Sequence, residues 1–228
     1  MNSTEIKYFN ELRNKVKIAS DVFKEDRFQG IWKSVIDKYP DAAHFIFELL
    51  QNADDAGASN VRIFLSENDL TLIHNGNVRF SITDPSLEKP DRENGRLGHI
   101  NSITSIGFST KSNDGGSLEN KIGKFGVGFK SVFQHTDTPY IYDDNFQFKL
   151  TDYIVPELLE KDHSLRKKGE TLFYLPFDKS EENKIESYNQ IKRKLSDLID
   201  PILFLQNLKE IEWQIDNQPL KTYKKGVI

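Results

Sequence analysis

A chain of 228 residues can bury one sizeable core, so its length predicts one large domain with a short appendage at most. Hydrophobic residues make up 37% and charged residues 29% of the chain, and the 16 Phe and 8 Tyr exclude a disordered chain, since such chains are poor in aromatic residues. The 31 basic and 35 acidic residues are interspersed and give a net charge of −4, which excludes a strong overall attraction to nucleic acid.

Helical spacing of apolar residues predicts two helices at the N-terminus, over residues 4–19 and within 22–39. A third helix is expected to begin at Asp41 as N-cap, after Pro40, and to end near Gly57. At 100° per residue, its Glu48, Asn52 and Asp55 fall within an arc of roughly 60° beside an apolar face. These three polar groups would therefore lie at the margin of the core, where a ligand pocket can form.

Two strand-like runs, 61–66 and 70–75, follow as a hairpin. Residues 83–120 are mostly polar, and such a long polar segment inside a compact domain predicts a mobile lid, with a simple surface insertion as the alternative. The glycine-rich stretch KIGKFGVGFKSVF (121–133) predicts a tight turn that enters a helix.

The C-terminal third alternates strand and helix patterns. Strands are expected at 140–142, 146–150 and 170–177, a helix at 181–199 that Pro201 ends, and a last apolar run at 202–215. No internal repeat and no linker divides the chain, which favours one domain with an N-terminal helical extension.

The sequence contains few residues suited to redox or zinc chemistry. It has no Cys, and its five His form no HExxH pattern. It also lacks a signal peptide's apolar centre and a run of the roughly eighteen apolar residues that a membrane span needs. We therefore expect a cytoplasmic protein without a membrane segment. Basic clusters at 166–168, 192–194 and 221–225 are typical of solvated surface, with nucleic-acid contact as the alternative.

Two segments together indicate a hydrolytic phosphate site. Gly123, Gly126 and Gly128 allow close approach of the backbone, whose N–H groups can hold a phosphate at a helix start. A glycine turn alone also fits a purely structural role. Combined with Asn52 as a Mg²⁺ ligand and Glu48 as a base that orients water, one helical turn apart, it outlines a hydrolytic site.

Four segments, in the order ELLQNADDA, LIHNG, IGKFGVGFKSVF and GETLFYLPF, resemble the GHKL (Bergerat-fold) ATP-binding domain. Their residue pattern is most similar to that of sacsin-like and Hsp90-like members. The resemblance covers roughly 27–216 and implies an α+β fold: a two-layer α/β sandwich whose mixed, mostly antiparallel sheet carries helices on one face. It implies a lid at about 84–122. Residues 1–26 would be a helical extension and 217–228 a tail or the start of a linker.

Carried over position by position, the resemblance implies that Glu48 polarises the attacking water and that Asn52 coordinates Mg²⁺. Asp55 would line the nucleotide pocket, Thr171 would join the water network around the adenine, and Lys111 would be a lid lysine near the phosphates. The turn that holds the phosphates and its packing neighbours would comprise Gly123, Phe125, Gly126, Val127, Gly128 and Phe129, of which the two Phe are expected to pack rather than contact ligand.

One segment departs from the family pattern. Where the family has the adenine-reading aspartate in a DxGxG motif, this chain has His74-Asn75-Gly76-Asn77-Val78. An Asn side-chain oxygen can accept a hydrogen bond from the adenine amino group, so Asn75 could replace the aspartate, with His74 as the competing candidate. A simple hairpin end and a nucleotide other than ATP stay open as alternatives.

The resemblance implies Mg²⁺-dependent binding of ATP and ADP with slow ATP hydrolysis, in which lid closure is coupled to a protein partner or further domains. Chaperone-like remodelling and bacterial defence against phage are roles of such domains, and dimerisation on nucleotide binding is common among them. The alternative is a degenerate, nucleotide-gated scaffold without turnover. A histidine-kinase-type phosphotransferase is disfavoured, because Glu48 is present and no His precedes His44.

Overall fold

The computed structural model describes residues 1–28, 30, 44–105, 128–196 and 205–225. Its strands are β1 (Asn60–Leu65), β2 (Asp69–His74), β3 (Tyr140–Tyr142), β4 (Gln147–Thr151), β5 (Val155–Leu158), β6 (Thr171–Pro176), β7 (Glu210–Ile215) and β8 (Lys221–Lys224). Its helices are α1 (Ser3–Phe23), α3 (His44–Asp55), α4 (Glu88–Glu93), α5 (His99–Ile103) and α6 (Glu181–Ser196), with 3₁₀ turns η1 (Asp26–Phe28) and η3 (Gly128–Gln134).

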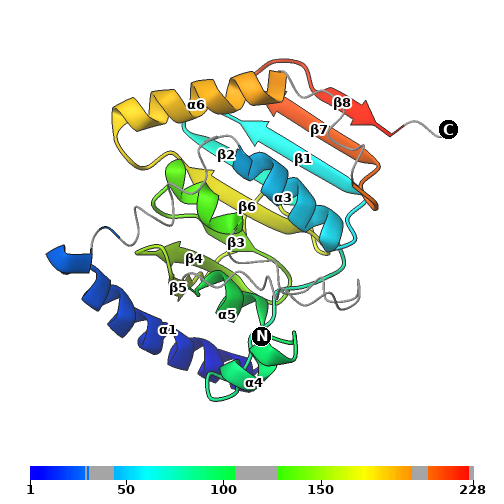
Figure 1. The fold of residues 1–228 in the computed structure, drawn as a ribbon. Helices are drawn as coiled ribbons and strands as arrows, with labels where there is room; N and C mark the ends of the chain where they lie inside the picture. Colours follow the sequence, from blue (N-terminus) through cyan, green and yellow to red (C-terminus); the bar gives the residue numbers. More distant parts are fainter. Residues whose placement is uncertain (29, 31–43, 106–127, 197–204, 226–228) are drawn as a thin grey trace.

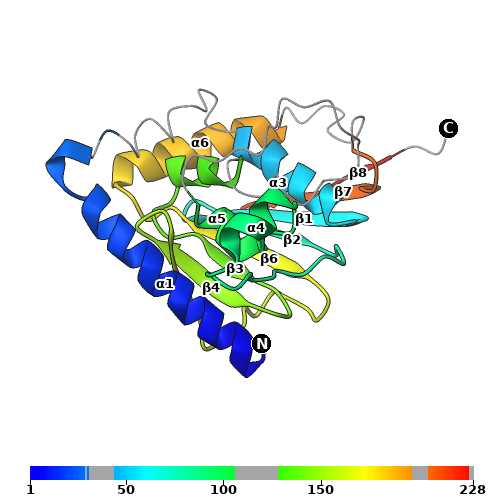
Figure 2. The same cartoon turned by 60° about the horizontal axis from the view of Figure 1, so that its bottom comes forward.

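The strands form one open sheet in the order β5-β4-β3-β6-β2-β1-β7-β8. Only the β1–β7 pair is parallel among these described strands, and the others are antiparallel. Helices α3 and α6 lie together over one face of the sheet (Figures 1 and 2). The predicted class, an α+β fold with a mixed, mostly antiparallel sheet and helices on one face, is confirmed.

The main core lies between this helical layer and the sheet. Strand β1 shows the alternation that such a face requires, since Val61, Ile63 and Leu65 are buried and the residues between them are half-buried. On the opposite face of the sheet, a smaller cluster is formed by Ile73, Tyr142 and Leu172. Half-buried tyrosines pack against it. Because the two clusters pack on the two faces of the middle strands, both faces of the sheet are covered at the end of β2.

Helix α1 packs on its own domain. Asn2 and Glu5 close its first turn reciprocally, with Glu5 N–H donating to Asn2 Oδ1 at 2.9 Å. Phe9 enters the main core, where its ring lies 6.2 Å from that of Phe146 and 6.1 Å from that of Phe148. The first helix therefore covers part of its own domain.

Some elements were not foreseen in the sequence. Strand β5 was missed, and β8, within the stretch predicted to be a tail, pairs with β7 and extends the sheet. Within the predicted lid, α5 buries Ile100 and Ile103 in the core. The second helix predicted within 22–39 lies mostly outside the described residues, as do the predicted N-cap Asp41 and residues 106–127.

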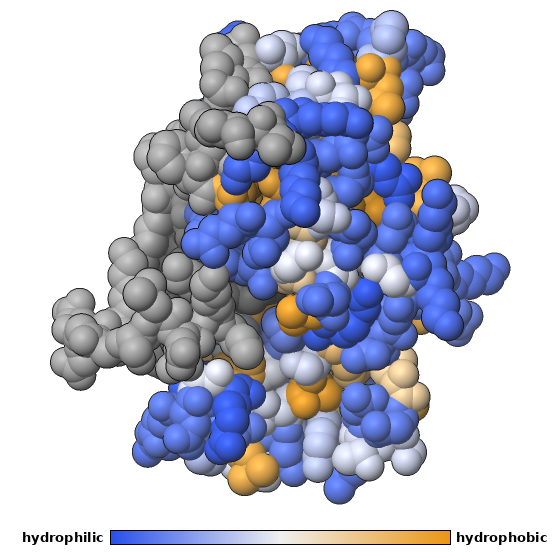
Figure 3. Space-filling model, turned by 90° about the vertical axis from the view of Figure 1, so that its right-hand side faces the viewer, coloured by the Kyte–Doolittle hydropathy of each residue, from blue (hydrophilic) through white to orange (hydrophobic). Residues whose placement is uncertain are grey.

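Among the described residues, no helix combines the length and apolar character needed to cross a membrane. The side of the molecule turned to the right in Figure 1 is mostly hydrophilic, with small separate hydrophobic patches among its coloured residues (Figure 3).

Candidate functional site

The helix that carries the predicted polar stripe is α3, and it forms for local reasons. Phe45, Ile46 and Leu49 recur at helical spacing and are fully buried against the sheet. Gly57 has φ +74°, which ends the helix, and Ala58 N–H donates back to Ala53 O at 2.9 Å in the pattern of a Schellman motif. The predicted stop at Gly57 is confirmed.

Glu48 and Gly128, predicted from segments eighty residues apart, lie in contact. A Cβ placed on Gly128 would overlap the carboxylate of Glu48 and come within 2.8 Å of its Cδ. Only glycine therefore lets the backbone at the start of η3 approach this half-buried carboxylate. Phe129, the next residue, is buried and its ring lies 5.8 Å from that of Phe173, which agrees with the packing role predicted for it.

Asn52 lies one turn after Glu48 and is 6% exposed, while Asp55 is half-buried. Within the described part of the chain, the Asn52 side-chain amide has no hydrogen-bond partner. Because no described residue pairs with this amide, it is available to a ligand. No group of three or more acidic or His residues able to hold a metal ion occurs among the described residues. A single amide oxygen nevertheless fits Mg²⁺, which keeps waters and takes phosphate oxygens as its other ligands.

Asp54 is a residue that sequence reasoning missed. Its buried carboxylate accepts hydrogen bonds from the backbone N–H groups of Gln206 (3.0 Å), Asn207 (2.6 Å) and Leu208 (2.8 Å). The Asn207 side chain donates to Asp54 O at 2.9 Å. Asp54 thereby fastens the end of α3 to the segment that enters β7. An acidic residue in the last turn of a helix opposes the helix dipole, and this was the available signal for a tertiary partner.

His74 ends β2 on the side of the sheet that faces the helices and is 4% exposed. The backbone N–H of Gly76 donates to its Nδ1 at 3.1 Å, and its ring stacks on Phe173 at 6.0 Å with an interplanar angle of 25°. Burial, aided by the positive charge of Arg79, lowers the pKa of His74 to about 3. The imidazole is therefore neutral, and its Nδ1 is the acceptor.

Asn75 is exposed and already engaged with the turn between α3 and β1. Its Oδ1 accepts hydrogen bonds from the backbone N–H groups of Ser59 and Asn60, both at 2.9 Å, and its Nδ2 donates to Ser59 Oγ at 3.0 Å. The role of Asn75 as the base-reading acceptor stays a prediction, but its oxygen here holds two backbone donors in place.

Thr171 lies directly opposite His74, because the first residue of β6 pairs with the last residue of β2. Directly paired residues project on the same face of a sheet. The hydroxyl of Thr171 is buried, the residue being 1% exposed, and no residue that the structure describes forms a hydrogen bond with it. The structure therefore brings together two of the residues predicted for the base end of the site.

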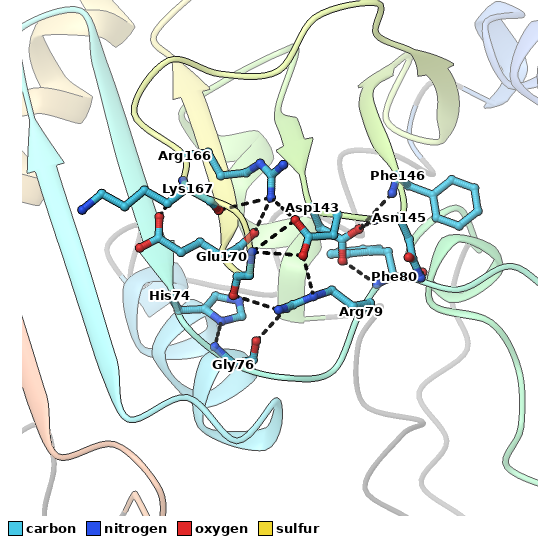
Figure 4. A network of polar contacts seen from close by, with 12 residues as sticks. His74, Gly76, Arg79, Phe80, Asp143, Asn145, Phe146, Arg166, Lys167 and Glu170 are labelled. Carbon is cyan, nitrogen blue, oxygen red and sulfur yellow. Dashed lines mark hydrogen bonds and ion pairs between the residues drawn. The ribbon is translucent and has the colours of Figure 1, made fainter. Parts of the chain in front are cut away.

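A polar network fixes this end of the sheet (Figure 4). Arg79 donates to Gly76 O at 2.6 Å and to Gly169 O at 2.8 Å, which ties the turn after β2 to the turn before β6. Asp144 accepts from Gly169 N–H at 3.0 Å and pairs with Arg166 at 2.7 Å. The positions of His74 and Thr171 are thus set by a shared frame of hydrogen bonds and ion pairs.

The contact of Glu48 with Gly128 lies in the N-terminal half of α3, whereas the turn beside His74 lies at its C-terminal end. A Cβ on Gly76 would meet both Ala56 O and Ala56 Cβ at 2.9 Å, so the turn after β2 abuts the C-terminal end of the helix. Glu48 and Ala56 are eight residues apart, about 12 Å along a helix at 1.5 Å per residue. This spacing suits an extended ligand with a phosphate chain beside Glu48 and a base beside His74.

Lys130 connects the glycine turn to the predicted lid. It is buried, and its Nζ donates to Tyr153 O at 2.8 Å and also to Ile103 O at the end of α5. Burial lowers the pKa of Lys130 to about 7. Five further predicted site residues lie outside the described residues: Lys111, Gly123, Phe125, Gly126 and Val127.

The family model described as the sacsin domain matches residues 25–170. Human sacsin is 30% identical over 122 residues, which cover 50% of this chain and 2% of sacsin. Protein NO VEIN of Arabidopsis thaliana is 34% identical over 127 residues, which cover 53% of this chain and 4% of that protein. The chain therefore corresponds to a small part of the curated relatives that it matches.

Among solved structures, the N-terminal domain of a DNA repair protein aligns with a TM-score of 0.47 and 14% identity, over 84% of this chain and 54% of that one.

Proposed function

Because the chain belongs to the sacsin domain family, we propose that it binds a magnesium–nucleoside triphosphate along α3 and hydrolyses it slowly, as an ATPase of the GHKL type. The observation that carries this proposal is the contact between the Glu48 carboxylate and Gly128, at the point where the glycine turn enters η3. This contact sets a proton acceptor beside backbone that can approach a phosphate closely.

Glu48 would act as the general base. In the proposed step, Glu48 accepts a proton from a water whose oxygen attacks the γ-phosphorus, while the bond from the γ-phosphorus to the β-phosphate oxygen breaks. Nucleoside diphosphate and phosphate are released, and the proton on Glu48 returns to solvent. Gly128 keeps the space for this carboxylate free, since any side chain there would displace it.

Asn52 would hold the metal. Mg²⁺ bound there would neutralise charge on the phosphate oxygens. Asn52 is suited to this role because the residue is nearly buried and its amide has no partner among the described residues, and because Asp54 and Gly57 anchor the C-terminal end of α3. A ligand held on a rigid helix needs little reorganisation on binding.

We further propose that basal turnover is low. A positive group that stabilises charge on the γ-phosphate is not present among the residues assigned to the site here, and removing one such stabiliser typically costs several orders of magnitude in rate. Lys111, a partner protein or a following domain could supply it. This is the basis for expecting lid closure to be coupled to a partner, a second copy of the chain or a further domain.

The test compares Glu48→Gln, Asn52→Ala and the exposed Gln51→Ala on the same helix. Glu48→Gln should keep Mg-nucleotide binding by calorimetry while phosphate release falls by about 10²-fold or more. Asn52→Ala should weaken binding in the presence of Mg²⁺ and leave metal-free binding unchanged. Gln51→Ala should match the wild type. Unchanged phosphate release in Glu48→Gln would contradict the assignment.

A nucleotide-gated scaffold without turnover is the second candidate. The observation in its favour is the neutral His74 at the position where the family has an ionised aspartate. A scaffold would bind nucleotide but release no phosphate above the Glu48→Gln background, so the same pair of measurements separates the two functions.

A further inference from the structure

Two hydrogen-bonding groups at the end of the sheet have no partner among the described residues. Thr171 Oγ1 is buried and unpaired, and His74 Nε2 makes no hydrogen bond with the described residues. The two residues form a directly opposed pair between β2 and β6 and project on the same side. They are therefore neighbours, and each offers one polar group that no described residue pairs with.

The structure determines which ring nitrogen of His74 carries the proton. A backbone N–H can only donate, so the bond from Gly76 N–H makes His74 Nδ1 the acceptor and leaves the proton on Nε2. The ring cannot readily exchange these roles, because it is stacked on Phe173 and the turn that carries Gly76 is held by Arg79. His74 thus presents a fixed N–H donor.

The hydroxyl of Thr171 gives no stability to the fold. A buried hydroxyl without a partner costs free energy, and Val would fill the same space without that cost. Unlike the imidazole, a hydroxyl rotates and can either donate or accept. The pair therefore offers one fixed donor beside one adaptable group, and neither is a fixed acceptor.

We propose that this pair reads a nucleobase through the His74 Nε2–H donor, so that the site accepts 6-oxopurine nucleotides, those of guanine and hypoxanthine, at least as well as ATP. This inference rests on the proposed function, since it assigns the base of the same nucleotide. A 6-oxo group accepts the bond from Nε2–H, and the adjacent N1–H donates to Thr171 Oγ1. Adenine fits the same pair only in a shifted register, with N1 accepting from Nε2–H and the 6-amino group donating to Thr171 Oγ1, so a pair without a fixed acceptor gives adenine no advantage.

The test measures dissociation constants for non-hydrolysable analogues of GTP, ITP and ATP with Mg²⁺ on the full chain. The wild type should bind the GTP and ITP analogues no more weakly than the ATP analogue. His74→Asp presents an acceptor and should raise the ratio of the GTP to the ATP dissociation constant about tenfold or more. A wild type that favours ATP tenfold, or a ratio that changes less than threefold in His74→Asp, overturns the proposal.

Further variants guard against a variant that fails to fold. His74→Asn introduces an uncharged acceptor and should shift the same ratio in the same direction. Thr171→Val should keep or raise the thermal midpoint while weakening all three purine analogues by at least threefold; unchanged affinity overturns the role of the hydroxyl. Asn75→Ala tests the competing candidate, and a shift of the ratio in that variant alone would assign the readout to Asn75 and overturn the proposal. Gln51→Ala is the matched control and should leave the ratio unchanged.

Failures of the two proposals are distinguishable. If no nucleoside triphosphate binds, with or without Mg²⁺, the proposed function and this inference both fall. If triphosphates bind and Asn52→Ala weakens them, but the base ratio does not respond to His74 variants, the proposed function stands and the readout by His74 is refuted.

Discussion

Asp54 should be one of the largest single contributors to stability outside the apolar core. Its carboxylate is buried and accepts three backbone N–H groups, at 2.6, 2.8 and 3.0 Å, from a segment about 150 residues away. Asp54→Ala removes the acceptor and leaves three donors unpaired, of which that of Leu208 is buried while Gln206 and Asn207 are exposed and can turn to water. Each lost bond to a charged group costs about 1.5 to 3 kcal/mol, with some relief by relaxation.

We therefore expect Asp54→Ala to lower the free energy of unfolding by about 3 to 5 kcal/mol, a large fraction of the ~5 to 15 kcal/mol of a typical domain. Asp54→Asn keeps one acceptor oxygen and should lose about half as much. The matched control is Gln51→Ala, exposed on the same helix, which should change stability by no more than about 0.5 kcal/mol.

The measurement is urea unfolding of the three variants and the wild type, followed by circular dichroism and by fluorescence, to which the buried Trp213 in β7 contributes. Because Asp54 anchors the segment that enters β7, the fluorescence transition should move together with the circular dichroism transition. A loss below about 1 kcal/mol in Asp54→Ala, or one equal to that of Gln51→Ala, would refute the reasoning.

Two further predictions concern η3, which begins at Gly128 and contains Lys130. Gly128→Ala should displace the Glu48 carboxylate, which its Cβ would overlap, so phosphate release should fall about tenfold or more in a single-turnover assay while the circular dichroism spectrum is kept; full activity would contradict the contact. For Lys130, the folded-state pKa of about 7 lies below the ordinary 10.5, so the unfolded chain binds more protons between these values and stability should rise with pH across that window. Urea unfolding should show this rise, at most about 1.4 kcal/mol per pH unit, and Lys130→Met should abolish it.

Local pattern determined the elements that carry the proposed chemistry. Helix α3, its stop at Gly57 and the hairpin of β1 and β2 follow from apolar periodicity and from a glycine with positive φ, which act within a few residues of each other. The stripe of Glu48, Asn52 and Asp55 follows from the same geometry, because helical spacing alone sets which side chains share a face.

Only the tertiary structure decided which groups meet. The parallel pairing of Asn60 with Glu210, the burial of Asp54 under the segment that precedes β7, and the addition of β8 depend on contacts between distant segments, for which no local spacing exists. The same holds at the base end of the site. The sequence favoured Asn75 as the base-reading residue, with His74 as the competing candidate. In the fold, the Asn75 oxygen is turned to the backbone of the α3–β1 turn, and His74 lies opposite the Thr171 hydroxyl, which no described residue pairs with. Hydrogen-bond polarity at such a position is a property of its neighbours in space, and these are known only once the sheet is assembled.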